Sequence, residues 1–273
     1  MSSSKHNRNF MSERRKAGAA IVVTGAAGGI GGGIARRLLA DGWRVVATDL
    51  NATTLAELQS QTGSSQLVTM PLDVAKADDI RKTAASLKER QIAVAGLVNA
   101  AGLLQDIKSF MAMDEAAQRH IWDVNYFGAV TCTQVFAASM MSDGGGSIIN
   151  ITSINETRPL PLHAYAPTKV ALGSLTTLTA GEFGPKGVRV NSIAPGFTLT
   201  PIMREKIASG KRNVSAIENA TAMRRLVEID EIAGVASFLM SDDASAVSGA
   251  SIPVDAGWLA TSYWMNFGEL LDS

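Results

Sequence analysis

Proton transfer needs an ionisable group with suitable neighbours, and Tyr165 and Lys169 are residues of this kind. Two hydroxyl side chains, Thr152 and Ser153, lie shortly before them in the sequence. A spacing of four residues places Tyr165 and Lys169 on the same face of a helix, one turn apart. A free tyrosine titrates near pH ~10 and is a poor base at neutral pH, but a neighbouring ammonium favours the phenolate. A nearby hydroxyl could hold the oxygen of an alcohol or carbonyl while the proton moves. The pattern alone is also common on ordinary helix surfaces.

The glycine-rich segment 24–31 reads Thr-Gly-Ala-Ala-Gly-Gly-Ile-Gly between an expected strand and an expected helix. Gly25 permits a tight turn, while Gly29 and Gly31 let the backbone approach a pyrophosphate at the helix N-terminus. No Gly-Lys-Ser/Thr ending follows, which argues against a nucleotide-hydrolysing P-loop. Beside Tyr165, this turn predicts hydride transfer to or from a nicotinamide, with the proton exchanged at Tyr165. A tight turn without a ligand remains the alternative.

Asp49 ends the second expected strand, 18 residues after Gly31. A carboxylate there can accept hydrogen bonds from the adenosine ribose hydroxyls and would repel a 2′-phosphate. No Arg or Lys follows at positions 50 and 51, and Gly28 occupies the loop position where a basic residue could meet that phosphate. The sequence therefore favours NAD over NADP. Alternatively, Asp49 or Asn51 caps the next helix.

These residues are spaced along a chain in which short apolar strands alternate with helical segments from Ala19 onward. Such alternation predicts an α/β protein with a Rossmann-like, doubly wound, mostly parallel seven-stranded sheet and helices on both faces. The expected strands are about 20–23, 44–48, 66–70, 94–98, 147–151, 188–193 and 251–254. The main expected helices are about 29–40, 76–89, 114–141 and 163–183, with a further one through Leu55 and Leu58.

We expect a single catalytic domain over residues 18–273, since no linker divides this pattern. The segment of about 198–228 breaks the alternation with polar, weakly helical sequence, and long excursions of this kind are usually functional or mobile. Residues 1–17 are polar and basic without an apolar stretch, so they predict a disordered arm rather than a secretory signal.

The composition excludes several classes of protein. Lys plus Arg equals Asp plus Glu at 25 each, which does not suggest nucleic acid or an anionic membrane as a partner. The single cysteine, Cys132, excludes an internal disulfide and a cysteine-cluster metal site. No apolar run is long enough to span a bilayer. We expect a cytoplasmic enzyme that needs no metal and acts on a small molecule.

Several motifs together resemble the short-chain dehydrogenase/reductase family over about residues 19–260. The family's Thr-Gly-x-x-x-Gly-x-Gly is matched by Thr24, Gly25, Gly29 and Gly31, and its Tyr-x-x-x-Lys by Tyr165 and Lys169. Its Asn-Asn-Ala-Gly differs here at the second position. The other matches are Asp73-Val74, Asn99-Ala100-Ala101-Gly102, Asn125, Pro195-Gly196, Thr200 and Val254-Asp255-Ala256-Gly257.

The resemblance implies a catalytic set of Asn125, Ser153, Tyr165 and Lys169. Family spacing would select Thr152 as the catalytic hydroxyl, whereas alignment after the fifth strand selects Ser153, which we favour. Lys169 would bind the nicotinamide ribose and lower the pKa of Tyr165, and Asn125 would anchor a water. The expected cofactor contacts are Gly25, Gly28, Gly29, Ile30, Gly31, Asp49, Leu50, Asp73, Val74, Asn99, Ala100, Ala101, Gly102, Tyr165, Lys169, Pro195, Gly196, Thr198 and Thr200.

The expected reaction is NAD-dependent interconversion of a secondary alcohol and a ketone, with a small polyol, sugar derivative or cyclic diol as the favoured substrate. A reductase of a 3-oxoacyl or other ketone substrate is the alternative, and a non-catalytic NAD-binding regulator is a third possibility. The resemblance also implies a homotetramer, in which helices 114–141 and 163–183 pair between subunits. The aromatic tail Tyr263–Phe267 could close a neighbouring active site.

Overall fold

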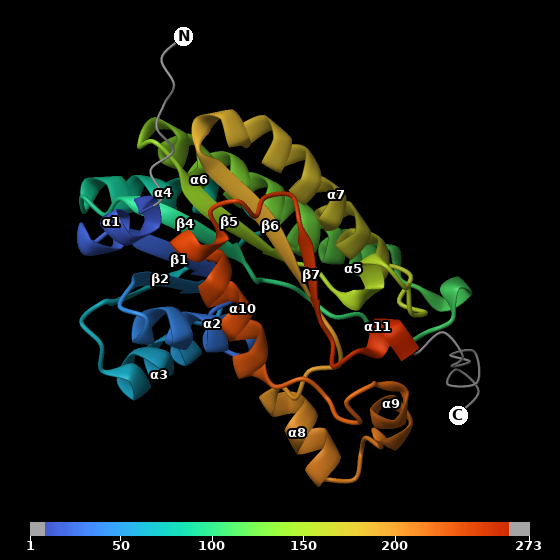
Figure 1. Cartoon of the computed structure of the whole chain (residues 1–273). Helices are drawn as coiled ribbons and strands as arrows, with labels where there is room; N and C mark the ends of the chain where they lie inside the picture. The colour runs from blue at the N-terminus through green and yellow to red at the C-terminus, as the bar shows by residue number, and fades with distance from the viewer. Residues whose placement is uncertain (1–8, 262–273) are drawn as a thin grey trace.

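The computed structural model describes residues 9–261 of the chain. Its centre is a seven-stranded sheet in the order β3-β2-β1-β4-β5-β6-β7 (Figure 1). Every neighbouring pair of strands is parallel. This confirms the predicted doubly wound, Rossmann-like fold. The strands are β1 (Ala20–Thr24), β2 (Arg44–Asp49), β3 (Leu67–Pro71), β4 (Val94–Asn99), β5 (Gly146–Ile151), β6 (Val188–Pro195) and β7 (Ser251–Val254).

Helices cover both faces of this sheet, with α2, α3 and α10 on one side and α4, α5, α6 and α7 on the other. Two short helices, α8 and α9, lie beyond the ends of β6 and β7. The helices are α1 (Phe10–Lys16), α2 (Gly29–Ala40), α3 (Ala52–Thr62), α4 (Ala77–Glu89), α5 (Glu115–Trp122), α6 (Ala129–Ser142), α7 (Tyr165–Phe183), α8 (Pro201–Ala208), α9 (Ser215–Ala220), α10 (Ile229–Leu239) and α11 (Trp258–Thr261).

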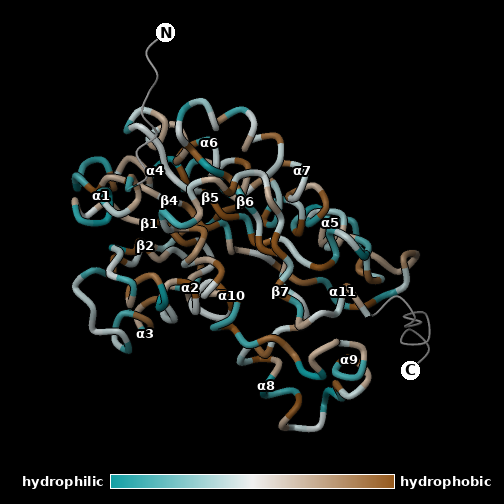
Figure 2. Tube along the Cα trace, in the orientation of Figure 1, coloured by the Kyte–Doolittle hydropathy of each residue, from teal (hydrophilic) through white to brown (hydrophobic). Residues whose placement is uncertain are grey.

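Alternate residues of β1 supply two separate hydrophobic cores. Ile21 and Val23 pack into the core beneath α2 and α10, whereas Ala20 and Val22 pack into the core beneath α4 and α6. The period of two follows from the strand geometry. It makes a strand buried on both faces apolar throughout. Figure 2 shows hydrophobic positions concentrated along the central strands, with hydrophilic positions along the outer helices and connections.

The N-terminal segment differs from its prediction. Residues 10–16 form α1 rather than a disordered arm, so that prediction was wrong for this stretch. Met11 is buried in the core, and the carboxylate of Asp242 accepts hydrogen bonds from the backbone N–H groups of Met11 and Ser12 at 2.8 and 2.9 Å. Arg14 donates to the carbonyl of Val94 at 3.1 Å. These partners are far away in the sequence, so local composition did not reveal them. Residues 1–8 and the tail Tyr263–Phe267 lie outside the described residues.

The predicted helix 114–141 is interrupted in its middle. Asp123–Gly128 is a π-helical segment between α5 and α6. A Cβ at Gly128 would lie 2.9 Å from the carbonyl oxygen of Val74, so the absence of a side chain allows the helix to approach the segment that follows β3. π-Helical turns are rare and often occur at functional sites. This one contains Asn125.

Candidate active site

The predicted site residues gather at the carboxyl ends of the strands. Asp49 ends β2, Asn99 ends β4, Ser153 follows β5 by two residues and Pro195 ends β6. In open parallel sheets, ligands bind in the crevice outside these ends. The fold therefore brings to one edge residues that are nearly 150 positions apart in the sequence.

The glycine turn after β1 has the close backbone approaches that a diphosphate site requires. Gly25 has a φ of +65°, and a Cβ there would lie 2.7 Å from the Cα of Ala101. A Cβ at Gly31 would lie 2.2 Å from the carbonyl oxygen of Gly25. Gly28, by contrast, has open space where a Cβ would be, directly before the N-terminus of α2. The turn thus fits a phosphate that approaches the free N–H groups of this helix.

Asp49 lies beside this turn. Its two carboxylate oxygens accept hydrogen bonds from the N–H groups of Ala27 and Asn51, each at 3.0 Å. Asn51, rather than Asp49, caps α3, because its side chain accepts from Thr53 and Thr54. Leu50 is 73% exposed. The Asp49 carboxylate therefore lies at the end of β2 beside the glycine turn, with the exposed Leu50 next to it.

The end of β4 is held by hydroxyl and amide groups. The Thr24 Oγ1 accepts from the N–H groups of Ala100 and Ala101, both at 3.1 Å. The Asn99 amide donates to Asn150 at 2.8 Å, and its Oδ1 has no hydrogen-bond partner within the described chain. The backbone here thus stays anchored although Ala100 replaces the family's asparagine.

Three more of the predicted cofactor contacts, Asp73, Thr198 and Thr200, make polar contacts within the chain. Asp73 accepts from the N–H of Ala75 at 3.0 Å and pairs with Lys76 at 3.1 Å. Thr198 donates to the carbonyl of Gly196 at 3.0 Å. Thr200 caps α8 by accepting from the N–H of Met203 at 3.3 Å. The Thr200 hydroxyl therefore serves as a helix cap in the cofactor-free structure.

Tyr165 is the first residue of α7, and Lys169 lies one turn further along the same helix. The Lys169 ammonium is buried, donates to the carbonyl oxygen of Ile151 at 2.8 Å and lies 5.4 Å from the centroid of the Tyr165 ring. Burial lowers the pKa of Lys169 to about 8. It also raises the pKa of Tyr165 above its ordinary value, and a hydrogen bond with Ser153 opposes that shift.

The pKa of Tyr165 is shifted upward in the cofactor-free protein, which is opposite to the net lowering that we predicted. Removing a phenolate from water is unfavourable, and in the described protein this effect outweighs the favourable interactions. Sequence spacing places an ammonium near the phenol but says nothing about the depth of burial.

Of the two candidate hydroxyls, Ser153 is the one that meets Tyr165. The Thr152 hydroxyl instead donates to the carbonyl of Ile193 at 3.0 Å and is buried between strands. Asn125 accepts from the N–H of Leu103 at 2.7 Å and donates to Thr168 at 3.3 Å. A Cβ placed on Gly102 would lie 3.6 Å from Asn125 Oδ1 and 3.7 Å from Lys169 Nζ, so these two polar groups approach the same point.

Comparison with known proteins agrees with this geometry. The family model described as enoyl-(acyl carrier protein) reductase matches residues 25–259. Galactitol 2-dehydrogenase (L-tagatose-forming) of Cereibacter sphaeroides is 34% identical over 245 residues, which are 88% of this chain and 95% of that protein. The chain belongs to the short-chain dehydrogenase/reductase family. Members of this family are oxidoreductases that act on CH–OH groups with a nicotinamide cofactor.

Two further comparisons show how much of the chain is shared. A short-chain type dehydrogenase/reductase from Mycobacterium ulcerans superimposes with a TM-score of 0.85 at 30% identity, covering 93% of this chain and 94% of that one. An uncharacterised family member of Sinorhizobium fredii is 35% identical over 250 residues, which are 90% of this chain but only 44% of that protein. This chain therefore spans less than half the length of that relative.

Two buried amides in this short-chain dehydrogenase/reductase were not found from the sequence. Gln105 Oε1 accepts from the N–H groups of Ala164 and Tyr165 at 2.7 and 3.2 Å, which caps α7 from the loop after β4. Asn155 donates its amide to Ser153 Oγ at 2.9 Å. Neither residue belongs to a repeated spacing or motif, so no sequence signal distinguished them from ordinary loop amides.

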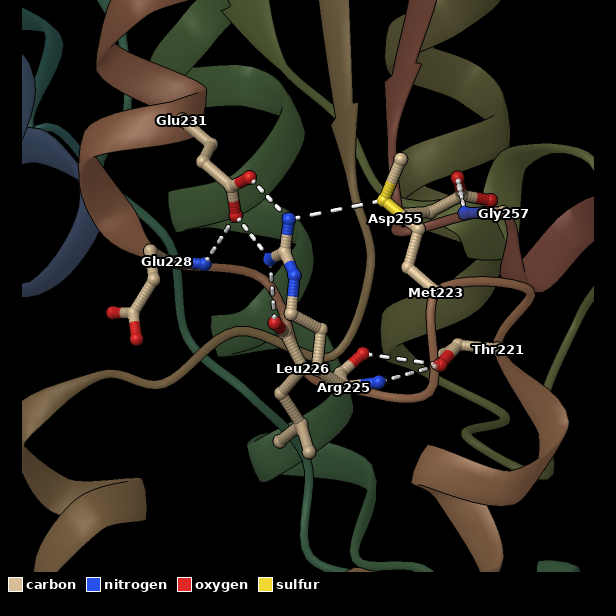
Figure 3. Close-up of polar contacts among 8 residues, drawn as sticks. All are labelled: Thr221, Met223, Arg225, Leu226, Glu228, Glu231, Asp255 and Gly257. Carbon is tan, nitrogen blue, oxygen red and sulfur yellow. Dashed lines mark hydrogen bonds and ion pairs between the residues drawn. The ribbon is translucent and has the colours of Figure 1, made fainter.

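The segment 198–228 follows β6, and an ion pair near its end joins it to α10 (Figure 3). Arg225 forms two 2.7 Å contacts with the carboxylate of Glu231 on α10 and donates to the carbonyl of Leu226 at 3.1 Å. Glu231 also accepts from the N–H of Glu228 at 2.9 Å. These bonds lower the pKa of Glu231 to about 2. The C-terminal end of the segment that carries α8 and α9 is thus anchored to the N-terminus of α10.

No group of three or more His, Cys, Asp and Glu side chains within residues 9–261 is arranged to hold a metal ion. Over the same range, no helix has the length and apolar character needed to cross a bilayer.

Proposed function

We propose that this protein interconverts a secondary alcohol and a ketone with NAD as its cofactor. The observation that supports this proposal is that Ser153, Tyr165 and Lys169 lie together at one edge of the sheet. The glycine turn and Asp49 lie at the same edge. The glycine turn offers the N-terminus of α2 to the pyrophosphate, and the Asp49 carboxylate accepts from the ribose hydroxyls. A bound nicotinamide supplies the acceptor or donor of the hydride.

The protein's own residues would handle the proton. Ser153 binds the oxygen of the substrate, and Tyr165 accepts the hydroxyl proton during oxidation or returns it during reduction. Lys169 uses one of its three N–H bonds for Ile151, which leaves two for the nicotinamide ribose. Its positive charge stabilises the Tyr165 phenolate when this forms. Asn125, which is held by Leu103 beside Lys169, would position a water that connects the ammonium with solvent.

We favour a small polyol, sugar derivative or cyclic diol as the substrate. The galactitol dehydrogenase relative supports this choice, because 88% of the chain aligns with it. Asp49 supports it as well, because it favours NAD, and a high cellular level of NAD+ favours oxidation of the alcohol. A panel of polyols, sugars and ketones, each assayed with NAD and NADP in both directions, tests the proposal. Turnover of a polyol with NAD supports it, and activity confined to NADP contradicts its cofactor assignment.

Reduction of a 3-oxoacyl substrate is the second candidate. It is favoured by the match to a family model described by acyl carrier protein chemistry. The same panel separates the two candidates when it includes a 3-oxoacyl thioester. Reduction of the thioester at a kcat/KM far above that for any polyol would select this alternative.

A further inference from the structure

The side chain of Asn155 is buried beside the proposed catalytic hydroxyl, two residues after Ser153. Its backbone N–H and its Nδ2 approach Ser153 Oγ at 3.2 and 2.9 Å. Its Oδ1 accepts a hydrogen bond from the N–H of Leu160 at 2.8 Å. Because a backbone N–H can only donate, the amide oxygen must face Leu160, and this fixes Nδ2 on the side of Ser153.

This arrangement determines what the Ser153 hydroxyl can do. A serine hydroxyl has one proton to donate and two lone pairs that accept. Asn155 occupies both accepting positions with two donors. The only capacity left on Ser153 is its own proton, and Tyr165 is the side chain that meets this hydroxyl.

We propose that Asn155 is a positioning residue that makes Ser153 an obligate hydrogen-bond donor toward Tyr165 and the substrate oxygen. The kinetic part of this inference rests on the proposed function. During oxidation, the substrate oxygen accepts from Ser153, so the substrate O–H can point only toward Tyr165. The O–H bond then breaks and its proton passes to the phenolate oxygen, while the C–H bond breaks and its hydride passes to the nicotinamide. A Ser153 able to accept would hold the substrate proton in an unproductive direction.

Asn155→Leu tests this inference because it removes the amide without adding a charge. Ser153 could then accept a hydrogen bond from the Tyr165 hydroxyl, which would stabilise the neutral phenol and raise its pKa. The chain has three tyrosines, so Tyr126→Phe with Tyr263→Phe leaves Tyr165 as the only one. The chemical shift of a ¹³Cζ-labelled tyrosine in the cofactor-free protein then reports its ionisation, while circular dichroism monitors folding.

A hydrogen bond contributes about 0.5–1.5 kcal/mol, so we expect the Tyr165 pKa to rise by about 0.4–1 unit in Asn155→Leu. The same substitution in a Ser153→Ala background should leave this pKa unchanged, because the serine that transmits the effect is absent. With a substrate in hand, Asn155→Leu should lower kcat about 3- to 10-fold and change KM less. It should cost nothing further in the Ser153→Ala background.

Asn191→Leu is the matched control, since Asn191 is also a buried amide with bonds on both sides, to Val247 and Ala250. It should lower stability without changing the Tyr165 pKa. If Asn155→Leu does not fold, Asn155→Asp retains the acceptor for Leu160. Its carboxylate would accept the hydrogen bond that Ser153 otherwise donates to Tyr165. Asn155→Asp should therefore raise the Tyr165 pKa more in the wild-type background than in the Ser153→Ala background, where only the added charge acts.

Equal pKa changes with and without Ser153 would overturn the inference, as would an unchanged pKa in Asn155→Leu. The titration needs neither cofactor nor substrate. A Ser153-dependent shift in a protein that oxidises no alcohol would therefore keep the inference and reject the proposed function. Turnover of a polyol without a Ser153-dependent shift would do the reverse.

Discussion

The ammonium of Lys169 lies 5.4 Å from the centroid of the Tyr165 ring and is anchored to the carbonyl of Ile151 at the end of β5. The helix spacing of the two residues and the strand end together fix this relationship. Lys169 is buried and Tyr165 is half-buried, and loss of contact with water shifts the pKa of each group against its charged form in the cofactor-free protein. Before a cofactor binds, the Lys169 ammonium and the Tyr165 phenolate are therefore both destabilised by their surroundings.

Lys169 should make the cofactor-free protein more stable as the pH rises from about 8 to about 10. Its pKa is about 8 in the folded protein, against an ordinary value of 10.5 for a lysine in water. Between these two pKa values Lys169 is protonated in the unfolded chain but not in the folded protein, and this proton stabilises the unfolded chain. Raising the pH removes that stabilisation of the unfolded chain. The gain should reach about 2–3 kcal/mol, at 1.36 kcal/mol per pKa unit. Above this window, the raised pKa of Tyr165 opposes the gain.

Denaturant unfolding at several pH values measures this effect as the difference between the wild-type protein and Lys169→Met. The difference should grow with pH. The exposed Lys186, changed to Met, provides the control and should show no such trend. A wild-type stability that falls in parallel with Lys169→Met would contradict the buried, depressed lysine.

Cofactor choice should depend on Asp49. Its carboxylate opposes a 2′-phosphate, and the exposed Leu50 beside it provides no compensating cation. Asp49→Ala with Leu50→Arg should narrow or reverse the ratio of kcat/KM for NAD over NADP. Asn51→Asp adds a carboxylate two residues away at a helix cap and serves as the control. Equal kcat/KM values for the two cofactors in the wild-type enzyme would show that Asp49 does not select between them.

Gln105 should support the catalytic helix. Its side-chain oxygen accepts from two N–H groups at the start of α7, and losing a helix cap costs about 0.5–2 kcal/mol. Gln105→Leu should lower the unfolding free energy by this amount and reduce kcat, because Tyr165 is one of the capped residues. Gln61→Leu, at an exposed position of α3, should change neither quantity. Thermal unfolding and steady-state kinetics measured side by side decide the matter.

The expected homotetramer can be tested on α7. Ile121 and Leu172 lie in the two helices that we expect to pair between subunits, but both are buried in the protein's own fold. Leu178 is 69% exposed on α7, and an exposed apolar residue of this kind suits a subunit contact. Leu178→Glu should dissociate the assembly in light scattering, whereas Ile202→Glu on α8 should leave its mass unchanged. A wild-type protein that is monomeric at micromolar concentration would refute the prediction.

The sequence predicted the seven-stranded sheet and its parallel strands, because these follow from local periodicity and short motifs. It did not predict α1, whose docking depends on Asp242, 231 residues from Met11 in the sequence. The π-helical turn around Asn125 and the hydrogen bonds of Gln105 and Asn155 were also missed, since each depends on contacts between distant segments. The direction of the Tyr165 pKa shift was wrong for the same reason, because spacing does not reveal burial.

Turnover by Tyr165→Phe is the most direct test of the central claim that Tyr165 exchanges the proton. The substitution removes only the phenolic oxygen and its proton, so the ring still packs beside Lys169. We predict that kcat on the true substrate falls to the background of the assay, while the Kd for NAD measured by calorimetry stays within about twofold of the wild-type value. Substantial turnover by Tyr165→Phe would contradict the account and require a different acid–base group.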